Sequence, residues 1–274
     1  MKYVFFGTPE FAAIILEKLI KAGMPPAVVV CNPDRPVGRE KILTPPPAKF
    51  SAEKYNIPIL QPEVLDSRFQ LLDSSFDFFV VAAYAKILPK EIIELPRLGT
   101  MGVHPSLLPK YRGATPIQSA ILAGEKETGT TIFLLDEKVD HGPMLVTGQL
   151  DITTSDNYET LLKKLAELSG DLLIKTLPQF IAGKMKPIPQ DETKATYTKK
   201  FTTEDAKVDL EKDDPEMILR KIRALNPEPG VFALSQSKGG LKRTKILDAD
   251  LKDGKIHPTK IQIAGKKPTL NRIL

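Results

Sequence analysis

Three continuous apolar runs, rich in valine and phenylalanine, lie in the first part of the chain at residues 3–6, 27–31 and 78–83. Such unbroken runs are typical of strands buried on both faces of a parallel sheet. Between the first two runs, apolar residues recur at helical spacing over Glu10–Ala22, and Thr8 is placed to cap this helix. Strand, helix and strand in this order predict a right-handed βαβ unit and hence an open α/β sheet.

Further periodic segments extend this pattern through the first two thirds of the chain. Short apolar strands are predicted at Thr100–His104, Thr130–Leu135 and Met144–Leu150. Helical spacing predicts helices at Pro116–Ala123 and Ser155–Ile181. Together these elements predict an α/β domain with an open, twisted, mostly parallel Rossmann-like sheet and helices on both faces.

The pattern changes after the long helix. Residues 183–200 are rich in lysine, proline and threonine and predict an ordered linker that passes over the surface. A helix is expected at Pro215–Ala224. Alternating segments typical of a small β-rich domain follow at Val231–Leu234, Thr244–Ala249 and Lys260–Ala264.

These changes predict three parts within the 274 residues, a length that suits two domains. The main α/β domain is expected to span residues 1–182, and the linker residues 183–200. Residues 201–274 are expected to form the small β-rich domain.

The composition excludes several classes of protein. One cysteine, Cys31, leaves no internal disulfide, and three histidines are too few and too scattered for a zinc cluster. The start of the chain does not have the pattern of a signal peptide, and no stretch approaches the roughly 18 apolar residues of a membrane span. With 42% hydrophobic and 27% charged residues, we expect a cytoplasmic enzyme that binds no metal and no membrane.

The net charge of +5 is unevenly distributed. Residues 1–180 carry a net −2, so the whole positive excess lies in residues 181–274. A lysine-rich solvated surface would explain this excess. Contact with a polyanion such as nucleic acid would explain it equally well.

A histidine and an aspartate stand out as candidates for proton transfer. His104 ends a predicted strand and precedes a turn bracketed by prolines, and Asp140 follows 36 residues later, after another predicted strand. A histidine gains and loses a proton near neutral pH, and a carboxylate can orient it. The alternatives are a buried histidine with satisfied hydrogen bonds and a carboxylate that caps a loop beside Gly142. His141 is expected to be a rim residue.

Two loops at the carboxyl ends of the first two strands are candidates for ligand contact, because open α/β sheets bind ligands there. The first turn holds one glycine, Gly7, where a dinucleotide fingerprint has three, so NAD binding is not expected. The second loop is stiffened by prolines and carries Arg35, Arg39 and Lys41. It is either a solvated crossover or a contact for a phosphate backbone.

Seven motifs occur in one order along the chain and together resemble the methionyl-tRNA formyltransferase family. The resemblance is close over roughly residues 1–230 and looser beyond. The turn around Ser106 is shared with other 10-formyltetrahydrofolate-dependent transferases, whereas the first two motifs are more particular to the tRNA enzymes. The seven motifs are Gly7–Phe11, Pro33–Arg39, Ala83–Pro89, His104–Pro109, Tyr111–Gly113, Pro116–Gln118 and Val139–Gly142.

The resemblance implies an activity. The family transfers a formyl group from 10-formyltetrahydrofolate to the α-amine of methionyl-initiator tRNA, without a metal or a covalent intermediate. In this chain His104 would be the catalytic histidine, which stabilises the oxyanion or relays the amine proton. Asp140 would orient His104 or accept a proton through water.

The resemblance also implies binding residues. The folate would bind at the turn formed by Ser106, Leu107, Leu108 and Pro109, whose prolines fix the backbone. Another wall of the pterin pocket would include Ile87 and Leu88, although a place in the core explains either side chain as well. The tRNA would contact Arg35, Arg39 and Lys41.

The C-terminal part departs from the family. From Phe201 it has 74 residues, whereas the family's OB-like barrel is longer, so a shortened tRNA-binding barrel is expected. Its basic tail would contact tRNA phosphates or would be an inert end. The protein is expected to be a monomer.

Gly102 is the second departure, because the family has an asparagine at this position that donates to the oxyanion. Loss of one such donor costs about 2.7–4 kcal/mol of transition-state stabilisation. We expect another group to compensate, such as protonated His104, a water beside Gly102 or a nearby side chain. A slow enzyme would also be consistent with the glycine, as would a protein that binds without catalysis.

Three functions compete with formylation of methionyl-tRNA. An amino-sugar nucleotide formyltransferase would share His104, Asp140 and the folate turn, but it would not need the arginine-tipped loop or the basic C-terminal third. A non-catalytic folate- or tRNA-binding homologue is supported by Gly102. A hydrolase of formyltetrahydrofolate would not need the basic domain.

Overall fold

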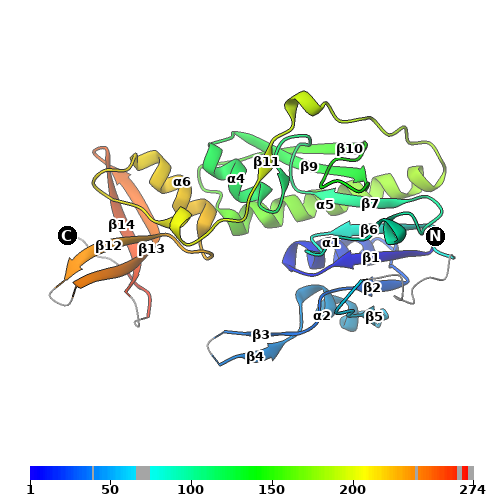
Figure 1. The fold of residues 1–274 in the computed structure, drawn as a ribbon, viewed down its shortest axis with the longest axis horizontal. Helices are drawn as coiled ribbons and strands as arrows, with labels where there is room; N and C mark the ends of the chain where they lie inside the picture. Colours follow the sequence, from blue (N-terminus) through cyan, green and yellow to red (C-terminus); the bar gives the residue numbers. More distant parts are fainter. Residues whose placement is uncertain (39, 66–74, 238–239, 264–266, 271–274) are drawn as a thin grey trace. The chain divides into compact units, whose positions relative to one another are not determined.

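The computed structural model describes residues 1–38, 40–65, 75–237, 240–263 and 267–270 (Figure 1). The chain forms two compact units, and each of them is built from three separate segments of the sequence. The first comprises Met1–Arg112, Thr128–Leu150 and Leu162–Tyr197, and the second Gly113–Glu127, Asp151–Leu161 and Thr198–Leu274. The domain limits expected from the sequence stay predictions.

A seven-stranded sheet with the order β10-β9-β7-β6-β1-β2-β5 is the framework of the first unit. Four neighbouring pairs, from β7 to β5, are parallel, and β9 runs antiparallel to β7. The predicted mostly parallel sheet is confirmed. Its strands are β1 (Tyr3–Gly7), β2 (Val28–Val30), β5 (Ile59–Leu60), β6 (Phe78–Ala82), β7 (Thr100–His104), β9 (Glu127–Leu134) and β10 (Met144–Asp151).

Helices cover both faces of this sheet (Figure 1). On one face, the rings of Tyr3 and Phe78 stack with centroids 4.9 Å apart, and Phe180 of α5 (Tyr158–Ile181) packs edge-on against Phe78. Next to α5 lies α1 (Glu10–Lys21), joined to it by Lys18, whose Nζ lies 2.6 Å from Glu167. These buried aromatic contacts fix the helices against the sheet.

The opposite face holds a core cluster that includes Val4, Phe6 and Phe79. The short helix α3 (Lys90–Ile93) closes it with both of its isoleucines, and Leu88 packs there with 6% of its surface exposed. Among the described residues of this unit, α2 (Pro47–Lys54) is a further helix. Because the strands are apolar on both faces, each face needs such a cover.

Two local predictions need correction. Thr8 does not cap α1: Pro9 is at the N-cap, and the Thr8 hydroxyl instead accepts from the Asn32 amide at 3.2 Å. The proline-rich loop after β2 is not only a loop, because β3 (Arg35–Val37) and β4 (Ile42–Thr44) pair in it as an antiparallel hairpin.

The second unit contains two helices packed together, α4 (Pro116–Ala123) and α6 (Pro215–Leu225). Asp214 caps α6 by accepting a hydrogen bond from the Met217 amide. The antiparallel sheet β12-β13-β14-β15 confirms the predicted β-rich C-terminal part. Its strands are Phe232–Ser237, Gly240–Lys252, Lys255–Ile263 and Thr269–Leu270.

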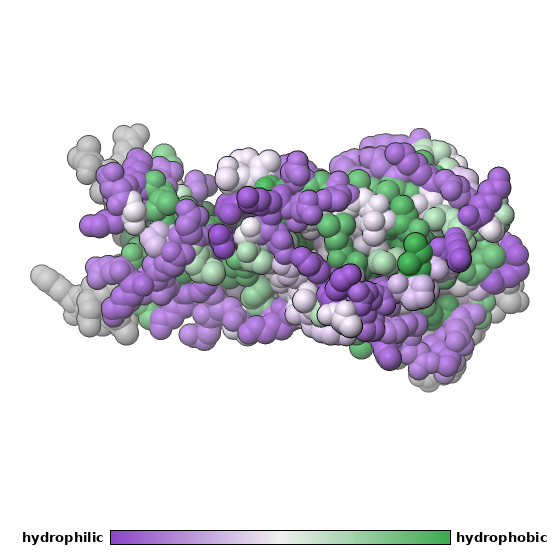
Figure 2. All heavy atoms as spheres, turned by 90° about the horizontal axis from the view of Figure 1, so that it is seen from above, coloured by the Kyte–Doolittle hydropathy of each residue, from purple (hydrophilic) through white to green (hydrophobic). Residues whose placement is uncertain are grey.

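The short elements left are β8 (Arg112–Gly113), which pairs with β11 (Tyr197–Thr198), and the 3₁₀ turns η1 (Glu192–Lys194) and η2 (Glu204–Ala206). Hydrophilic residues, purple in Figure 2, cover most of the face shown, with apolar residues between them. Within the described ranges, no helix is long and apolar enough to cross a membrane.

Two neighbouring residues test the core assignment. We predict that Leu88→Ala lowers the free energy of unfolding by about 2–5 kcal/mol, because it leaves a cavity in the cluster. Ile87→Ala should change it by less than about 0.5 kcal/mol, because 87% of Ile87 is exposed. Urea unfolding of both variants measures this difference, and equal losses would contradict the assignment.

Candidate active site

His104, at the end of β7, lies beside the aspartate that follows β9. All five residues of β7 are buried, and 6% of His104 is exposed. Its Nδ1 lies 3.4 Å from Oδ2 of Asp140, and its Nε2 lies 2.9 Å from the backbone oxygen of Tyr111. The structure therefore brings together the two residues that the sequence suggests for proton transfer.

These two contacts assign the protons of the imidazole. A backbone carbonyl can only accept, so Nε2 carries a proton and donates to Tyr111. Nδ1 faces the carboxylate of Asp140. The separation of 3.4 Å exceeds the about 2.7–2.9 Å of a charge-assisted hydrogen bond. This contact is therefore looser than the one that Nε2 makes with Tyr111.

Asp140 lies in a tight turn with an uncommon backbone conformation. Its φ is 48°, in the left-handed region, where a non-glycine residue persists only if its surroundings hold it. Two residues later, a side chain on Gly142 would overlap the backbone oxygen of Leu134. The turn is therefore pressed against the end of β9, and only glycine fits at position 142.

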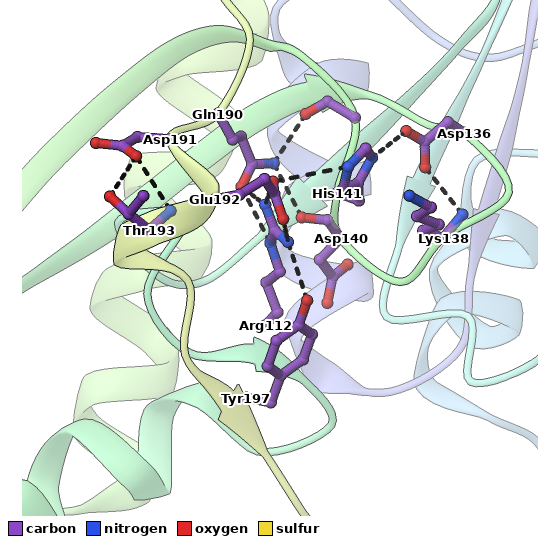
Figure 3. A network of polar contacts seen from close by, with 11 residues as sticks. Arg112, Asp136, Lys138, Asp140, His141, Gln190, Asp191, Glu192, Thr193 and Tyr197 are labelled. Carbon is purple, nitrogen blue, oxygen red and sulfur yellow. Dashed lines mark hydrogen bonds and ion pairs between the residues drawn. The ribbon is translucent and has the colours of Figure 1, made fainter.

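A fully buried arginine lies next to this turn (Figure 3). The guanidinium of Arg112 donates to Oε1 of Gln190 from Nε at 3.1 Å and from Nη2 at 2.7 Å. It makes a two-point ion pair with Glu192, at 2.6 and 3.0 Å, and donates to the hydroxyl of Tyr197. Hydrogen bonds from Arg112 hold the pKa of Glu192 below its usual range. A buried guanidinium requires such partners.

Gln190 and Glu192 lie in the segment that the sequence assigns to a surface linker. The local pattern of lysine, proline and threonine there gives no sign of a role at the site. The one sign in the sequence of an acidic residue near the site was Arg112 in the Tyr111–Gly113 motif, because a buried arginine needs an acidic partner. That partner is 80 residues away along the chain, so local periodicity could not identify it.

His141 makes its own ion pairs beside Asp140. Its Nδ1 contacts Asp136, and its Nε2 lies 3.6 Å from Glu192 (Figure 3). Its side chain is 29% exposed. These contacts fit the predicted position at the rim.

The predicted folate turn is tightly bonded within the protein. The Ser106 hydroxyl donates to the backbone oxygen of Lys110 at 2.6 Å, and the Ser106 amide donates to that of His104. Thr131 bridges the turn: its Oγ1 donates to the backbone oxygen of Ser106 and accepts from the amide of Leu108. The amides of Ser106 and Leu108 are therefore already paired within the protein. Leu107 and Pro109 are half-buried.

The two residues expected in the pterin wall differ in environment. Leu88 packs in the core cluster, whereas Ile87 is exposed to solvent. Their side chains do not line one surface, and a role for Ile87 in binding stays a prediction.

Of the residues expected to contact tRNA, Arg35 and Lys41 lie in the β3–β4 hairpin. Arg35 is exposed and lies 3.7 Å from Glu63, and Lys41 is exposed at the turn. Arg39 lies outside the described residues.

The space beside Gly102 is filled by apolar side chains. A Cβ at this position would lie 2.5 Å from Cε1 of Phe133 and 2.5 Å from Cδ1 of Leu135. Gly102 pairs with Phe133 across the β7–β9 ladder, so the ring covers the glycine from the adjacent strand. This leaves no room for a water at the Cβ position.

A metal would need a cluster of ligands. In the parts of the chain that the structure covers, no group of three or more histidine, cysteine, aspartate or glutamate residues could hold one.

Comparison with known proteins gives consistent matches. The family model described as Formyl transferase matches residues 1–177, and that described as Formyl transferase, C-terminal domain, matches residues 200–270. The methionyl-tRNA formyltransferase of Halalkalibacterium halodurans is 44% identical over 241 residues, covering 87% of this chain and 76% of the relative. That of Kosmotoga olearia is 44% identical over 256 residues, covering 92% and 81%.

Solved structures share the fold at lower identity. Methionyl-tRNA formyltransferase from Clostridium thermocellum aligns with a TM-score of 0.60 and 20% identity, over 96% of this chain and 98% of that chain. The sugar 3N-formyl transferase WlaRD aligns with a TM-score of 0.67 and 18% identity, over 97% and 99%. At these identities the likeness shows the fold.

Gly102 gives a prediction about packing. Gly102→Asn should lower the free energy of unfolding by about 1–3 kcal/mol, because the new side chain overlaps Phe133 and Leu135. Combining it with Phe133→Ala should cost less than the sum of the two single losses, because the shortened side chain makes room. Urea unfolding of the three variants measures both quantities.

The matched control is Gly254→Asn, where no atom lies within 4 Å of the added Cβ and asparagine tolerates the left-handed φ of 72°. Its loss should be smaller than that of Gly102→Asn. A Gly102→Asn variant as stable as the unmodified protein would show that the space is not closed.

Proposed function

This chain belongs to the formyl transferase family, and we propose that it transfers a formyl group from 10-formyltetrahydrofolate to the α-amine of methionyl-initiator tRNA. The observation that carries the proposal is the His104–Asp140 pair, 3.4 Å apart at the end of a buried strand. The acceptor follows from the relatives at 44% identity, which are named methionyl-tRNA formyltransferases. Sugar formyltransferases are similar at 18–20% identity, which supports the fold and not a sugar acceptor.

The proposed reaction is an acyl transfer. The amine nitrogen attacks the formyl carbon, the carbonyl oxygen becomes an oxyanion, and the bond to the folate nitrogen then breaks. One proton leaves the attacking amine and one reaches the departing nitrogen, so the proton count balances. His104 can serve through Nδ1, which is the less tightly bonded nitrogen, and Asp140 would steady the charged ring.

Gly102 changes how the oxyanion is stabilised. It supplies no side-chain donor, and Phe133 covers its Cβ direction. In this proposal the Nδ1–H of His104 therefore carries more of the stabilisation than in an enzyme with asparagine at this position. Because only 6% of His104 is exposed, its burial strengthens that single hydrogen bond.

The binding sites extend the proposal. The folate would lie against the turn from Ser106 to Pro109, with Leu107 and Pro109 offering apolar surface. The exposed hairpin residues Arg35 and Lys41 would contact tRNA phosphates, as Arg39 would.

Each of the three parts of the chain would have its own role. Residues 1–182 would carry catalysis, residues 183–200 would link the domains, and the basic residues 201–274 would contact tRNA. The reaction would take place in the cytoplasm, where the translation machinery uses its product.

A formylation assay with purified protein tests the proposal. We predict formyl transfer to initiator methionyl-tRNA and none to a nucleotide-linked amino sugar. His104→Asn and Asp140→Asn should each lower kcat by about 100- to 10,000-fold, because each removes a group that moves or steadies a proton.

The control is Asp171→Asn on α5, the same change as Asp140→Asn at an aspartate whose side chain is 55% exposed, which should leave kcat within about threefold. Transfer to the amino sugar would replace the proposed acceptor. Binding of formyltetrahydrofolate or tRNA with no turnover would indicate a homologue that binds without catalysis.

A further inference from the structure

We propose that Gln190 is a positioning residue for Asp140, which it holds through the backbone of the turn that carries this carboxylate. The inference rests on the proposed function, because it assigns a role within the same site. Gln190 lies outside the motifs that carry the family resemblance, in the segment expected to be a linker.

The amide of Gln190 joins the site turn to the buried arginine (Figure 3). Its Nε2 donates to the backbone oxygen of Asp140 at 2.9 Å and to that of Gly142 at 2.8 Å. Its Oε1 accepts from Nε and Nη2 of Arg112, at 3.1 and 2.7 Å. All four bonds lie within the first unit.

The chemistry of these partners permits one orientation of the amide. Arg112 has donors only, and the two backbone carbonyls have acceptors only. A flipped amide would place its NH₂ against the guanidinium and its oxygen against the carbonyls, and all four bonds would be lost. Gln190 is therefore locked in the direction that holds the turn.

The backbone of the turn at Asp140 needs such support. Asp140 has a left-handed backbone, which persists where neighbouring groups over-determine it. Gly142 is pressed against Leu134 on one side, and Gln190 bonds to the turn from another. Together they define the direction in which the carboxylate leaves the backbone.

The position of Gln190 is itself fixed at both ends. Two residues before it, Ile188 and Met144 exchange two backbone hydrogen bonds of 2.8 Å, which set the register of this segment against the start of β10. Two residues after it, Glu192 pairs with Arg112. The path from Arg112 to His104 is thus continuous: guanidinium, Gln190 amide, backbone of the turn, Asp140 carboxylate and imidazole.

This path predicts an effect on the chemical step. A catalytic group displaced by about 1 Å can cost up to about 100-fold in rate. Because Gln190 acts through Asp140, its loss should lower kcat and leave KM for both substrates nearly unchanged. A residue that contributed only to the stability of the protein would not lower kcat while leaving KM unchanged.

Two substitutions at Gln190 separate its bonds. Gln190→Leu removes all four at similar volume. Gln190→Glu keeps an oxygen for Arg112 and so retains the support of the buried charge, but it replaces the donor facing the two carbonyls by an acceptor. Both should lower kcat by about 10- to 100-fold. Gln190→Glu should do so with a melting temperature near that of the unmodified protein.

The decisive comparison places Gln190→Leu in the background of Asp140→Asn. Two residues that act as a unit are non-additive. If Gln190 acts through Asp140, the double variant should be no more than about twofold slower than Asp140→Asn. Gln179→Leu is the matched control, because the described bond of the Gln179 side chain is to the backbone of its own helix, at Lys175. It should keep the kcat of the unmodified protein.

The outcomes distinguish this inference from the function on which it rests. Full kcat in Gln190→Glu, or a loss from Gln190→Leu that is the same with and without Asp140→Asn, would overturn the role of Gln190 while formyl transfer stands. No formyl transfer by the unmodified protein would instead overturn the proposed function. A kcat loss in both Gln190 variants, together with a Gln190→Leu loss that vanishes in the Asp140→Asn background, supports the inference.

Discussion

The burial of one positive charge is the constraint on which the site depends. The Arg112 side chain has no exposed surface, and an unpaired charge in that position would cost several kcal/mol. Glu192 neutralises it, and Gln190 takes two of its remaining donors. These partners draw the segment after α5 against the turn that carries Asp140. The partners that a buried guanidinium requires therefore also fix the geometry beside His104.

The elements that follow from burial were predictable from the sequence. β1, β2 and β6 are apolar on both sides because both faces of the sheet are covered, and that condition leaves a continuous run in the sequence. The β3–β4 hairpin was missed because its three-residue strands are exposed and carry no such pattern. Thr8 was wrongly predicted to cap α1. Its hydroxyl instead accepts from the amide of Asn32, just after β2, and local capping rules do not include such a partner.

The motifs predicted the pairing of His104 with Asp140, but they did not reveal the residues that hold this pair in place. Gln190 lies 50 residues from Asp140 and 78 from Arg112 along the chain, and a glutamine in a polar segment has no local signature of a buried role. Gly102 was recognised as a departure, yet its packing is set by the neighbouring strand, where Phe133 fills the space. Partners distant in the sequence are set by the fold, so a single sequence does not reveal them.

This polar chain presents the Asp140 carboxylate to Nδ1 of His104, while Nε2 stays bonded to Tyr111. Long-range ¹⁵N–¹H correlation spectra of the His104 ring measure this arrangement directly. The neutral ring should carry its proton on Nε2, and Asp140→Asn should alter the Nδ1 shift more than the Nε2 shift. A neutral ring protonated on Nδ1, or an Nδ1 shift that Asp140→Asn leaves unchanged, would overturn the arrangement.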